Sequence, residues 1–390
     1  MLKKSIVSLL LVTIVAVVIF FAVLPGIADR KMNRVIEHKS YQISNEALLL
    51  HQTLFVADLH ADPTLWGRDL LTRHDYGHMD IPRMRRGNHA LQVFTTVTKS
   101  PSGLNYENNA ADSRDNITLI AMSQRWPLKS WDNLTERALY QAAVLKDMER
   151  RAPDEFMVIE SKSELNEFYR RRENGELIVA GIIGTEGSHA LEGQLSNIQR
   201  LYEAGFRMMS LQHFFDNRIG GSLHGKKKGG LTTFGEEVVR KIDSMPILLD
   251  VSHSSEAVVE DVLAMVRHPL VISHTGIKGH CDSHRNISDD LMRRVAATGG
   301  VIGIGFWDAA VCDPSPDSIA EAIVTAVDLL GEDHVGLGSD FDGAVETAFD
   351  VSEMAVLTQA LLNRNVPEAV IRKVMGENVR RVFLERLPDA

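Results

Sequence analysis

The segment FVADLHADPTLW, from Phe55 to Trp66, decides how the rest of the chain is interpreted. It opens with apolar or small residues and then places ionisable side chains at every second position, at Asp58, His60 and Asp62. In a β-strand this spacing puts all three side chains on one face. Because buried polar groups need partners, we expect other parts of the chain to bring polar groups to the same place.

Seven further apolar runs follow this segment. Helical patterns lie between most of them, at 234–244, 256–267, 289–297 and 316–330. Short apolar runs that alternate with helices predict a parallel sheet covered on both faces. Eight such units in roughly 330 residues fit a (β/α)₈ TIM-like barrel, and an open doubly wound sheet is the alternative. The eight runs are 54–60, 90–97, 177–187, 206–214, 246–253, 269–274, 300–306 and 334–343.

The composition excludes one class of partner. The 390 residues are 44% hydrophobic and 24% charged, which is ordinary for a globular protein, and the net charge is −10. No nucleic acid is expected as a partner, because phosphate contacts need a basic face. The one dense basic run, Lys226 to Lys228, is interpreted as a solvated loop.

Residues 1–30 are expected to be an N-terminal membrane anchor. Lys3 and Lys4 precede an uncharged run from Ser5 to Ala28, which is long enough to span a bilayer. An uncleaved transmembrane helix is favoured, because the apolar core of a signal peptide has about 7–15 residues. The small residues Gly26-Ile27-Ala28 are an alternative cleavage site, and cleavage would make the protein secreted. The two lysines favour a cytoplasmic N-terminus, with the remaining chain outside the cytoplasm, periplasmic or extracellular.

Residues 31–390 are expected to form a single (β/α)₈ domain, because no flexible linker divides them. The range 33–53 is predicted to be a short amphipathic helix that leads into it. The range 99–151 is long for one connection and holds a helical pattern from about 134 to 150. We interpret it as an insertion that covers the polar strand ends. The alternative is an ordinary helical connection without this role.

Polar side chains close six of the eight apolar runs. The C-terminal ends of the strands of a (β/α)₈ barrel meet on one face, so these side chains are expected to converge there. Imidazole and carboxylate together suit zinc and related divalent metals. Five candidate ligands exceed the needs of one open catalytic zinc, so two ions that share a carboxylate fit the count better. The candidate ligands are His60, Asp62, Glu186, His253 and His274, and His213, Asp340 and Asp342 close the remaining runs.

Other polar residues are given structural roles. Asp58 is expected to orient a ligand from outside the metal shell. His51, His74, His78, His89, His268 and His334 are interpreted as ordinary hydrogen-bonded histidines, and His189, His224, His280 and His284 as bystanders in loops.

At this point the sequence resembles a known family, the membrane dipeptidases or renal dipeptidase family, which are binuclear zinc peptidases of the amidohydrolase-like barrel type. The similarity extends over nearly the whole chain after residue 30, and the order and spacing of the motifs make it specific. The motifs are DLHAD (58–62), GTEGSHAL (184–191), GLTTFGEEVVRKIDSMPILLDVSHSS (230–255), PLVISHTGIKGHCDSHRNISDD (269–290), GLGSDFDG (336–343) and GENVRRVF (376–383).

The resemblance implies a metal site and a reaction. His60 and Asp62 would bind one zinc ion, His253 and His274 the other, and Glu186 would bridge the two. A hydroxide shared by the two Zn²⁺ ions would then attack the peptide bond of a dipeptide.

It also implies substrate contacts. His213 matches a histidine near the scissile carbonyl, and Arg285 matches the arginine that holds the terminal carboxylate of the substrate. Asp340 matches the acid that contacts the substrate amine and shuttles a proton. Some relatives carry a disulfide whose first cysteine has the position of Cys281, so a bridge from Cys281 to Cys312 is a hypothesis. Dimerisation is common in the family, so a homodimer is possible.

The sequence departs from the family pattern in places, and these departures leave alternatives. Glu186-Gly187-Ser188-His189 replaces the more frequent Glu-Gly-Gly-His, and the loop LQHFFDNRIGGS (211–222) differs from the usual version, which puts the substrate preference in doubt. One alternative function is another binuclear-metal hydrolase that acts on phosphoesters, lactones or cyclic amides. Another is a membrane-tethered binding protein that has lost catalysis.

Overall fold

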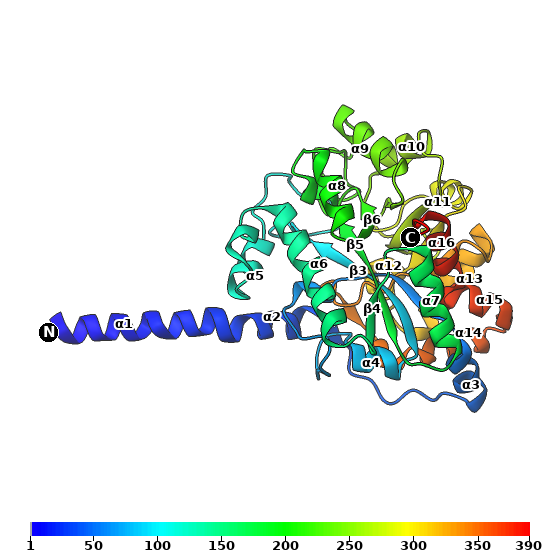
Figure 1. Ribbon diagram of the computed structural model, residues 1–390, viewed down its shortest axis with the longest axis horizontal. Helices are drawn as coiled ribbons and strands as arrows, with labels where there is room; N and C mark the ends of the chain where they lie inside the picture. Colours follow the sequence, from blue (N-terminus) through cyan, green and yellow to red (C-terminus); the bar gives the residue numbers. More distant parts are fainter. Residues whose placement is uncertain (1) are drawn as a thin grey trace.

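The computed structural model describes residues 2–390. Its first part is one long helix, formed by α1 (Leu2–Val18), the π-helical η1 (Ile19–Val23) and α2 (Leu24–Met32), and α1 projects away from the rest of the chain (Figure 1). Among the described residues, one helix, over Lys4–Met32, is long and apolar enough to cross a membrane. Its apolar side chains are exposed, for example Leu9 at 68%. A membrane anchor and a signal sequence both fit this helix.

Eight parallel strands form a closed barrel, as the alternating pattern predicts. Each strand pairs with its neighbours in parallel, and the pairings β3–β5 and β10–β2 close the ring. Closure rules out the open doubly wound sheet. A short strand, β4 (Phe156–Val158), pairs with the edge of β5. The barrel strands are β2 (Val56–Ala61), β3 (His89–Val97), β5 (Val179–Glu186), β6 (Phe206–Ser210), β7 (Leu248–Asp250), β8 (Leu270–Thr275), β9 (Val301–Ile304) and β10 (Val335–Leu337).

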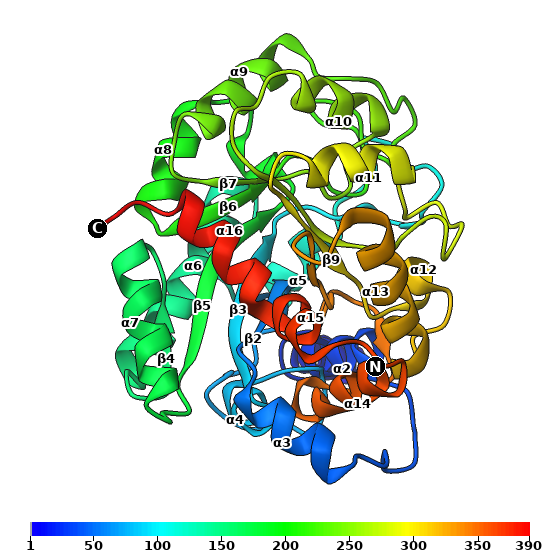
Figure 2. The same ribbon diagram turned by 90° about the vertical axis from the view of Figure 1, so that its right-hand side faces the viewer.

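Helices surround the barrel on the outside (Figure 2). Several begin at a side-chain cap; Thr232 accepts from Gly235 N and Ser255 from Val258 N, which satisfies amides that the first turn leaves free. Helix α16 (Asn378–Arg386) lies across the strands, where Val379 and Phe383 pack with Leu59 in one apolar cluster. The other helices are α3 (Asn45–Thr53), α4 (Ile81–Arg86), α5 (Ile117–Ser123), α6 (Leu134–Arg151), α7 (Lys162–Glu173), α8 (Ser196–Glu203), α9 (Thr233–Asp243), α10 (Glu256–Leu263), α11 (Asp289–Ala296), α12 (Asp308–Val311), α13 (Pro316–Leu330), α14 (Ala355–Asn363) and α15 (Glu368–Arg372).

The helix expected over 33–53 is wrong for its first part. Helix α2 ends before Asn33, and β1 (Arg34–Val35) pairs in parallel with β11 (Glu346–Thr347). Helix α3 begins only at Asn45, where the Ser44 side chain accepts from Ala47 N. The pairing with a strand more than 300 residues away overrides the local helical pattern.

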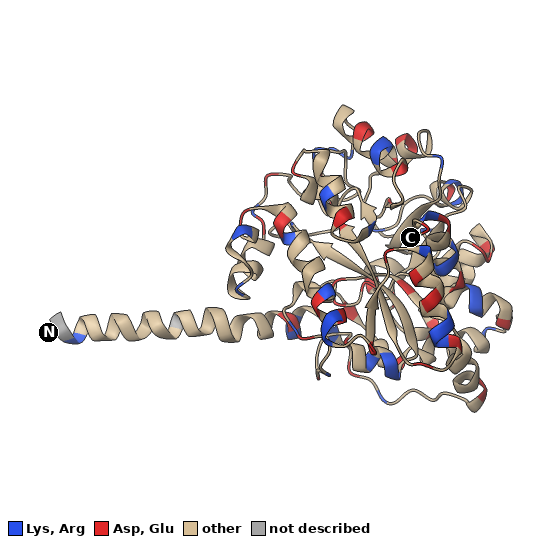
Figure 3. Cartoon of the chain, in the orientation of Figure 1, with Lys and Arg blue, Asp and Glu red and all other residues tan. Residues whose placement is uncertain are grey.

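The connection after β3 contains α5 and α6, and α5 packs against α2 (Figure 1). It therefore lies beside the base of the N-terminal helix. Cys281 and Cys312 form a disulfide, as the family resemblance suggested. Charged side chains of both signs are spread over the barrel domain, whereas α1 is almost uncharged (Figure 3). The basic run Lys226–Lys228 is exposed, as expected of a loop.

Candidate metal centre and active site

The five predicted metal ligands meet around one carboxylate at the C-terminal ends of the strands. Glu186, the last residue of β5, places Oε1 3.5 Å from His60 Nε2, 3.2 Å from His253 Nε2 and 3.6 Å from His274 Nε2. Asp62 approaches the same nitrogen of His60, with Oδ2 3.6 Å from Nε2. All five side chains are buried.

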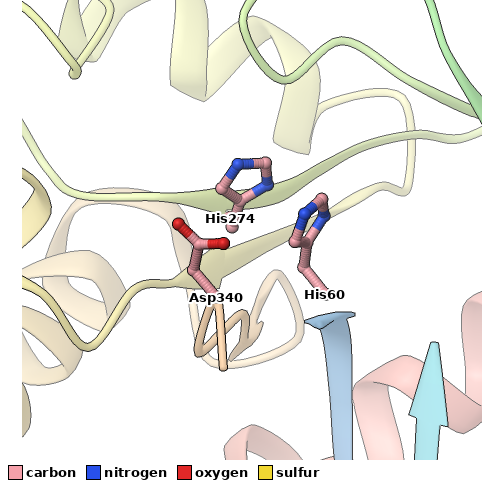
Figure 4. A group of neighbouring side chains, drawn as sticks. All are labelled: His60, His274 and Asp340. Carbon is pink, nitrogen blue, oxygen red and sulfur yellow. The ribbon is translucent and has the colours of Figure 1, made fainter. Parts of the chain in front are cut away.

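The five predicted ligands, together with His213 and Asp340, form three overlapping groups that could hold a metal ion. In each group the candidate ligand atoms lie within 4.8 Å of one another. Figure 4 shows the group of His60, His274 and Asp340, whose side chains converge from three separate strand ends. The other groups are His60 with Asp62 and Glu186, and Glu186 with His213 and His253. Glu186, the predicted bridging residue, belongs to two of the groups. His60, which was assigned to one ion, also belongs to two.

His60 and His274 both contact Ser273 through Nδ1, so their Nε2 atoms face the metal cluster. Ser273 Oγ donates to Asp250 Oδ2 at 2.7 Å, and the same oxygen lies 3.0 Å from His60 Nδ1 and 2.9 Å from His274 Nδ1. Because the single hydroxyl hydrogen is used on Asp250, both imidazoles have to donate from Nδ1. In a neutral imidazole this tautomer leaves the lone pair on Nε2, which is the form that binds a metal. Burial lowers the pKa of His60, but Asp62 and Glu186 outweigh it and raise this pKa well above the ordinary value, so a cation bound there would replace a proton.

The Nε2 atoms of His60, His253 and His274 are placed where a cation could bind. His60 Nε2 is buried and has no hydrogen-bond partner among residues 2–390. The Nε2 atoms of His253 and His274 are 2.9 Å apart. Buried imidazole nitrogens and carboxylates that face one another match the donor set of zinc sites. The residues present therefore fit a divalent metal.

The hydrogen bonds of Asp58 and Asp62 fix the strand ends that carry this cluster. Asp58 Oδ1 accepts from His60 N at 2.8 Å and Oδ2 accepts from Ser339 N at 2.9 Å, so Asp58 orders the backbone of a ligand, as expected. Asp62 Oδ1 accepts from Thr95 Oγ1 at 2.6 Å. Asp62 is thereby held with Oδ2 directed to His60.

Burial and the neighbouring charges together set the protonation of the cluster. Burial lowers the pKa of His253 and His274 well below the ordinary value, which keeps both imidazoles neutral, as metal ligation requires. Burial opposes the ionisation of Glu186, but His213, His253 and His60 outweigh it and hold the pKa of this carboxyl well below its usual range. Burial also raises the pKa of Asp340 well above its ordinary value, against the attraction of His60.

The remaining predicted residues line a cavity of about 190 Å³ that opens onto the cluster. His213 Nε2 lies 3.4 Å from Glu186 Oε2, and its Nδ1 lies 3.1 Å from Lys99 O. Arg285 is buried, and its Nη2 donates to His274 O. The φ angles of His253 and Asp340 are 59° and 61°, a left-handed conformation that non-glycine residues rarely adopt and that the surroundings have to hold. The apolar part of the lining includes Trp66, Val97, Ile117, Phe214 and Trp307.

Sequence reasoning missed four residues of this site. Asp250 and Ser273 had a signal, because one ends an apolar run and the other directly precedes His274. Tyr106, from the long connection after β3, and Met32, from α2, also line the cavity, and neither stands in a recognisable motif. The Oη of Tyr106 accepts from Trp307 Nε1 at 2.9 Å.

A closed parallel barrel with buried imidazoles and carboxylates at its strand ends defines a metallohydrolase. Comparison with known proteins identifies the family: the model of the membrane dipeptidases, peptidase family M19, matches residues 44–387. The chain belongs to this family of metal-dependent dipeptidases.

Individual relatives agree with this assignment. Dipeptidase verJ of Clonostachys rogersoniana is 31% identical over 252 residues, which are 63% of this chain and 64% of that protein, slightly less than two thirds of its length. Dipeptidase aclJ of Aspergillus oryzae is 28% identical over 408 aligned residues, covering 98% of this chain and 88% of that protein. A crystal structure of a metallopeptidase from Rhodobacter sphaeroides, liganded with a phosphinate mimic of the dipeptide L-Ala-D-Ala, shares 26% identity with a TM-score of 0.69. It covers 86% of this chain and 99% of that chain.

Proposed function

We propose that this chain is a zinc-dependent dipeptidase with two Zn²⁺ ions. His60 and Asp62 would hold one ion, His253 and His274 the other, and Glu186 would bridge them. The observation that carries the proposal is the convergence of three imidazole nitrogens on Glu186 Oε1, at 3.2–3.6 Å. Bound zinc would polarise the scissile carbonyl and lower the pKa of water, which supplies the nucleophile near neutral pH.

The protein residues would bind and orient the dipeptide. Arg285 presents a fork of donors, and its Nε has no hydrogen-bond partner within the described chain, so a substrate carboxylate can take that position. His213 is fixed by its contact with Lys99 O and presents Nε2 to the carbonyl oxygen as negative charge develops there. Asp340 would contact the substrate amine and deliver a proton to the leaving group. The cavity of about 190 Å³ favours short peptides.

The dipeptide mimic in the Rhodobacter sphaeroides enzyme supports a dipeptide as the substrate of this chain too. We further propose that residues 1–30 anchor the protein in a membrane. Residues 31–390 would then form the catalytic domain outside the cytoplasm, with an insertion at about 99–151. The exposed apolar helix over Lys4–Met32 supports the anchor.

The test is an assay of the purified full-length chain in detergent. The metal is removed with a chelator and restored with zinc, and L,L and L,D dipeptides are compared with phosphoesters and lactones. Zinc-dependent cleavage of a dipeptide, with two zinc ions per chain by elemental analysis, is the expected result. Cleavage of phosphoesters or lactones but of no dipeptide would refute the proposal.

A further inference from the structure

The helix that could cross a membrane is joined to the active site by a buried carboxylate. Asp29, in α2, is 1% exposed, and its carboxylate accepts from Arg68 Nε and from Asn33 Nδ2, both at 2.7 Å. Burial raises the pKa of Asp29 to about 6 against the attraction of Arg68, so the group is ionised at neutral pH. A buried charge at the base of a helix is unstable unless its partners are fixed, so this contact specifies one position of the helix.

Arg68 extends the connection to the loop that carries Asp340. Its Nη2 forms an ion pair with Asp342 Oδ2 at 2.5 Å, and its Nη1 donates to Met79 O at 2.9 Å. Asp342 lies two residues after Asp340. Its other carboxylate oxygen accepts from His78 N at 2.6 Å, so both oxygens of Asp342 are engaged.

The segment after α2 lies along the same loop. Asn33 Oδ1 accepts from Ala344 N at 2.9 Å, and β1 pairs with β11 immediately afterwards. Met32 lines the active-site cavity next to Gly343 and Ala344. The segment from Asn33 to Val35 therefore contacts the loop directly between residues 344 and 347, and Asp29 reaches Asp342 through Arg68.

The loop itself needs such support. Asp340, Asp342 and Ala344 all have positive φ angles, of 61°, 62° and 64°. Three non-glycine residues in the left-handed region within five positions persist only where the surrounding contacts hold them. Arg68 contacts this stretch at Asp342 and Asn33 contacts it at Ala344, and Asp29 holds both Arg68 and Asn33. The family match begins at residue 44 and does not include Asp29 or Asn33.

We propose that Asp29 and Asn33 are positioning residues of the active site, which hold the Asp340 loop in its catalytic conformation through the contacts Asp29–Arg68–Asp342 and Asn33–Ala344. This inference rests on the proposed function, because it concerns the role given there to Asp340. The N-terminal helix thus contributes to catalysis as well as to any anchoring.

The test compares Asp29→Asn with a matched control on the same helix, Arg30→Gln. Arg30 forms an exposed ion pair with Asp75 at 3.5 Å, and its side chain is 55% exposed. Both variants are made in the full-length chain in detergent. Asp29→Asn should lower kcat for a cleaved dipeptide about 10- to 100-fold, as expected for a displaced reacting group. KM and bound metal should stay close to wild type, and Arg30→Gln should leave kcat unchanged.

A double variant separates coupling from general destabilisation. Asp29 and Arg68 belong to the same series of contacts, which ends at Asp342. Asp29→Asn combined with Arg68→Gln should therefore lower kcat little more than the stronger single change. Hydrogen exchange of peptides covering 338–347 should increase in Asp29→Asn and not in Arg30→Gln. This second readout needs no turnover, so it tests the inference even if no dipeptide is cleaved.

Other results would overturn the inference. Wild-type kcat and unchanged hydrogen exchange in Asp29→Asn would do so. A loss of bound metal in parallel with kcat, or multiplicative losses in the double variant, would show a structural role instead.

Discussion

Replacing Ser273 with alanine tests the tautomer of the metal-ligand histidines. The hydroxyl of Ser273 contacts four buried atoms: Asp250 Oδ2 at 2.7 Å, His274 Nδ1 at 2.9 Å, His60 Nδ1 at 3.0 Å and Ser252 Oγ at 3.1 Å. Ser273→Ala removes the acceptor that directs both imidazole protons to Nδ1. Each ring is then free to carry its proton on Nε2, where it would block the metal.

The expected loss follows from these contacts. Partners behind a metal ligand typically contribute 10- to 100-fold to metal affinity, which is about 1.4–2.7 kcal/mol. Here one side chain serves two ligands, so the loss of zinc affinity should lie near the upper end, about 100-fold. The buried Asp250 oxygen also loses its donor, which should lower the stability of the metal-free chain by about 1–3 kcal/mol.

Competition with a chelator of known zinc affinity measures the first effect, and urea unfolding of the metal-free chain measures the second. Ser130→Ala is the matched control, because Ser130 is also fully buried and its hydroxyl donates to Pro127 O at 2.7 Å, outside the active site. Ser130→Ala should keep wild-type zinc affinity. If Ser273→Ala also binds zinc within about twofold of wild type, the proposed control of the tautomer is refuted, since such a change is far below the range expected for these partners.

Three further predictions concern substrate binding, metal binding and pH. Arg285→Ala should mainly raise KM, by about 1.5–3 kcal/mol for a lost charge-assisted contact, and an unchanged KM on a cleaved dipeptide would contradict its role. His60→Ala should lose metal and nearly all turnover, and two zinc ions per chain in elemental analysis of the variant would contradict the ligand assignment. Burial lowers the pKa of His89 to about 3 from an ordinary 6.5. As the pH falls, His89 is therefore protonated in the unfolded chain before it is protonated in the folded chain. The free energy of unfolding then decreases between pH 6.5 and pH 3. The loss at pH 5 is about 2 kcal/mol relative to pH 8, and His89→Gln should remove that part of the pH dependence in urea unfolding; an unchanged pH dependence would contradict it.

Much of the fold was predictable because strand and helix patterns are local. Each of the eight predicted apolar runs overlaps one barrel strand, and the helix predicted over 316–330 has the bounds Pro316–Leu330. The helix predicted from Asn33 was wrong up to Ser44, because the pairing of β1 with β11 depends on residues that are distant in sequence. The cavity lining by Tyr106 and Met32 was missed for the same reason.

The sequence alone determined the order of strands and helices, the presence of imidazole and carboxylate side chains at the strand ends, and the family. Each of these depends on residues close together in the chain, on side-chain periodicity or on short motifs. Only the tertiary structure decided which groups complete the site: the Ser273 hydroxyl shared by two imidazoles and the link from Asp29 through Arg68 to Asp342. Hydrogen bonds and ion pairs act over about 3 Å. Their partners are therefore fixed by barrel closure, which brings residues more than 200 positions apart into contact.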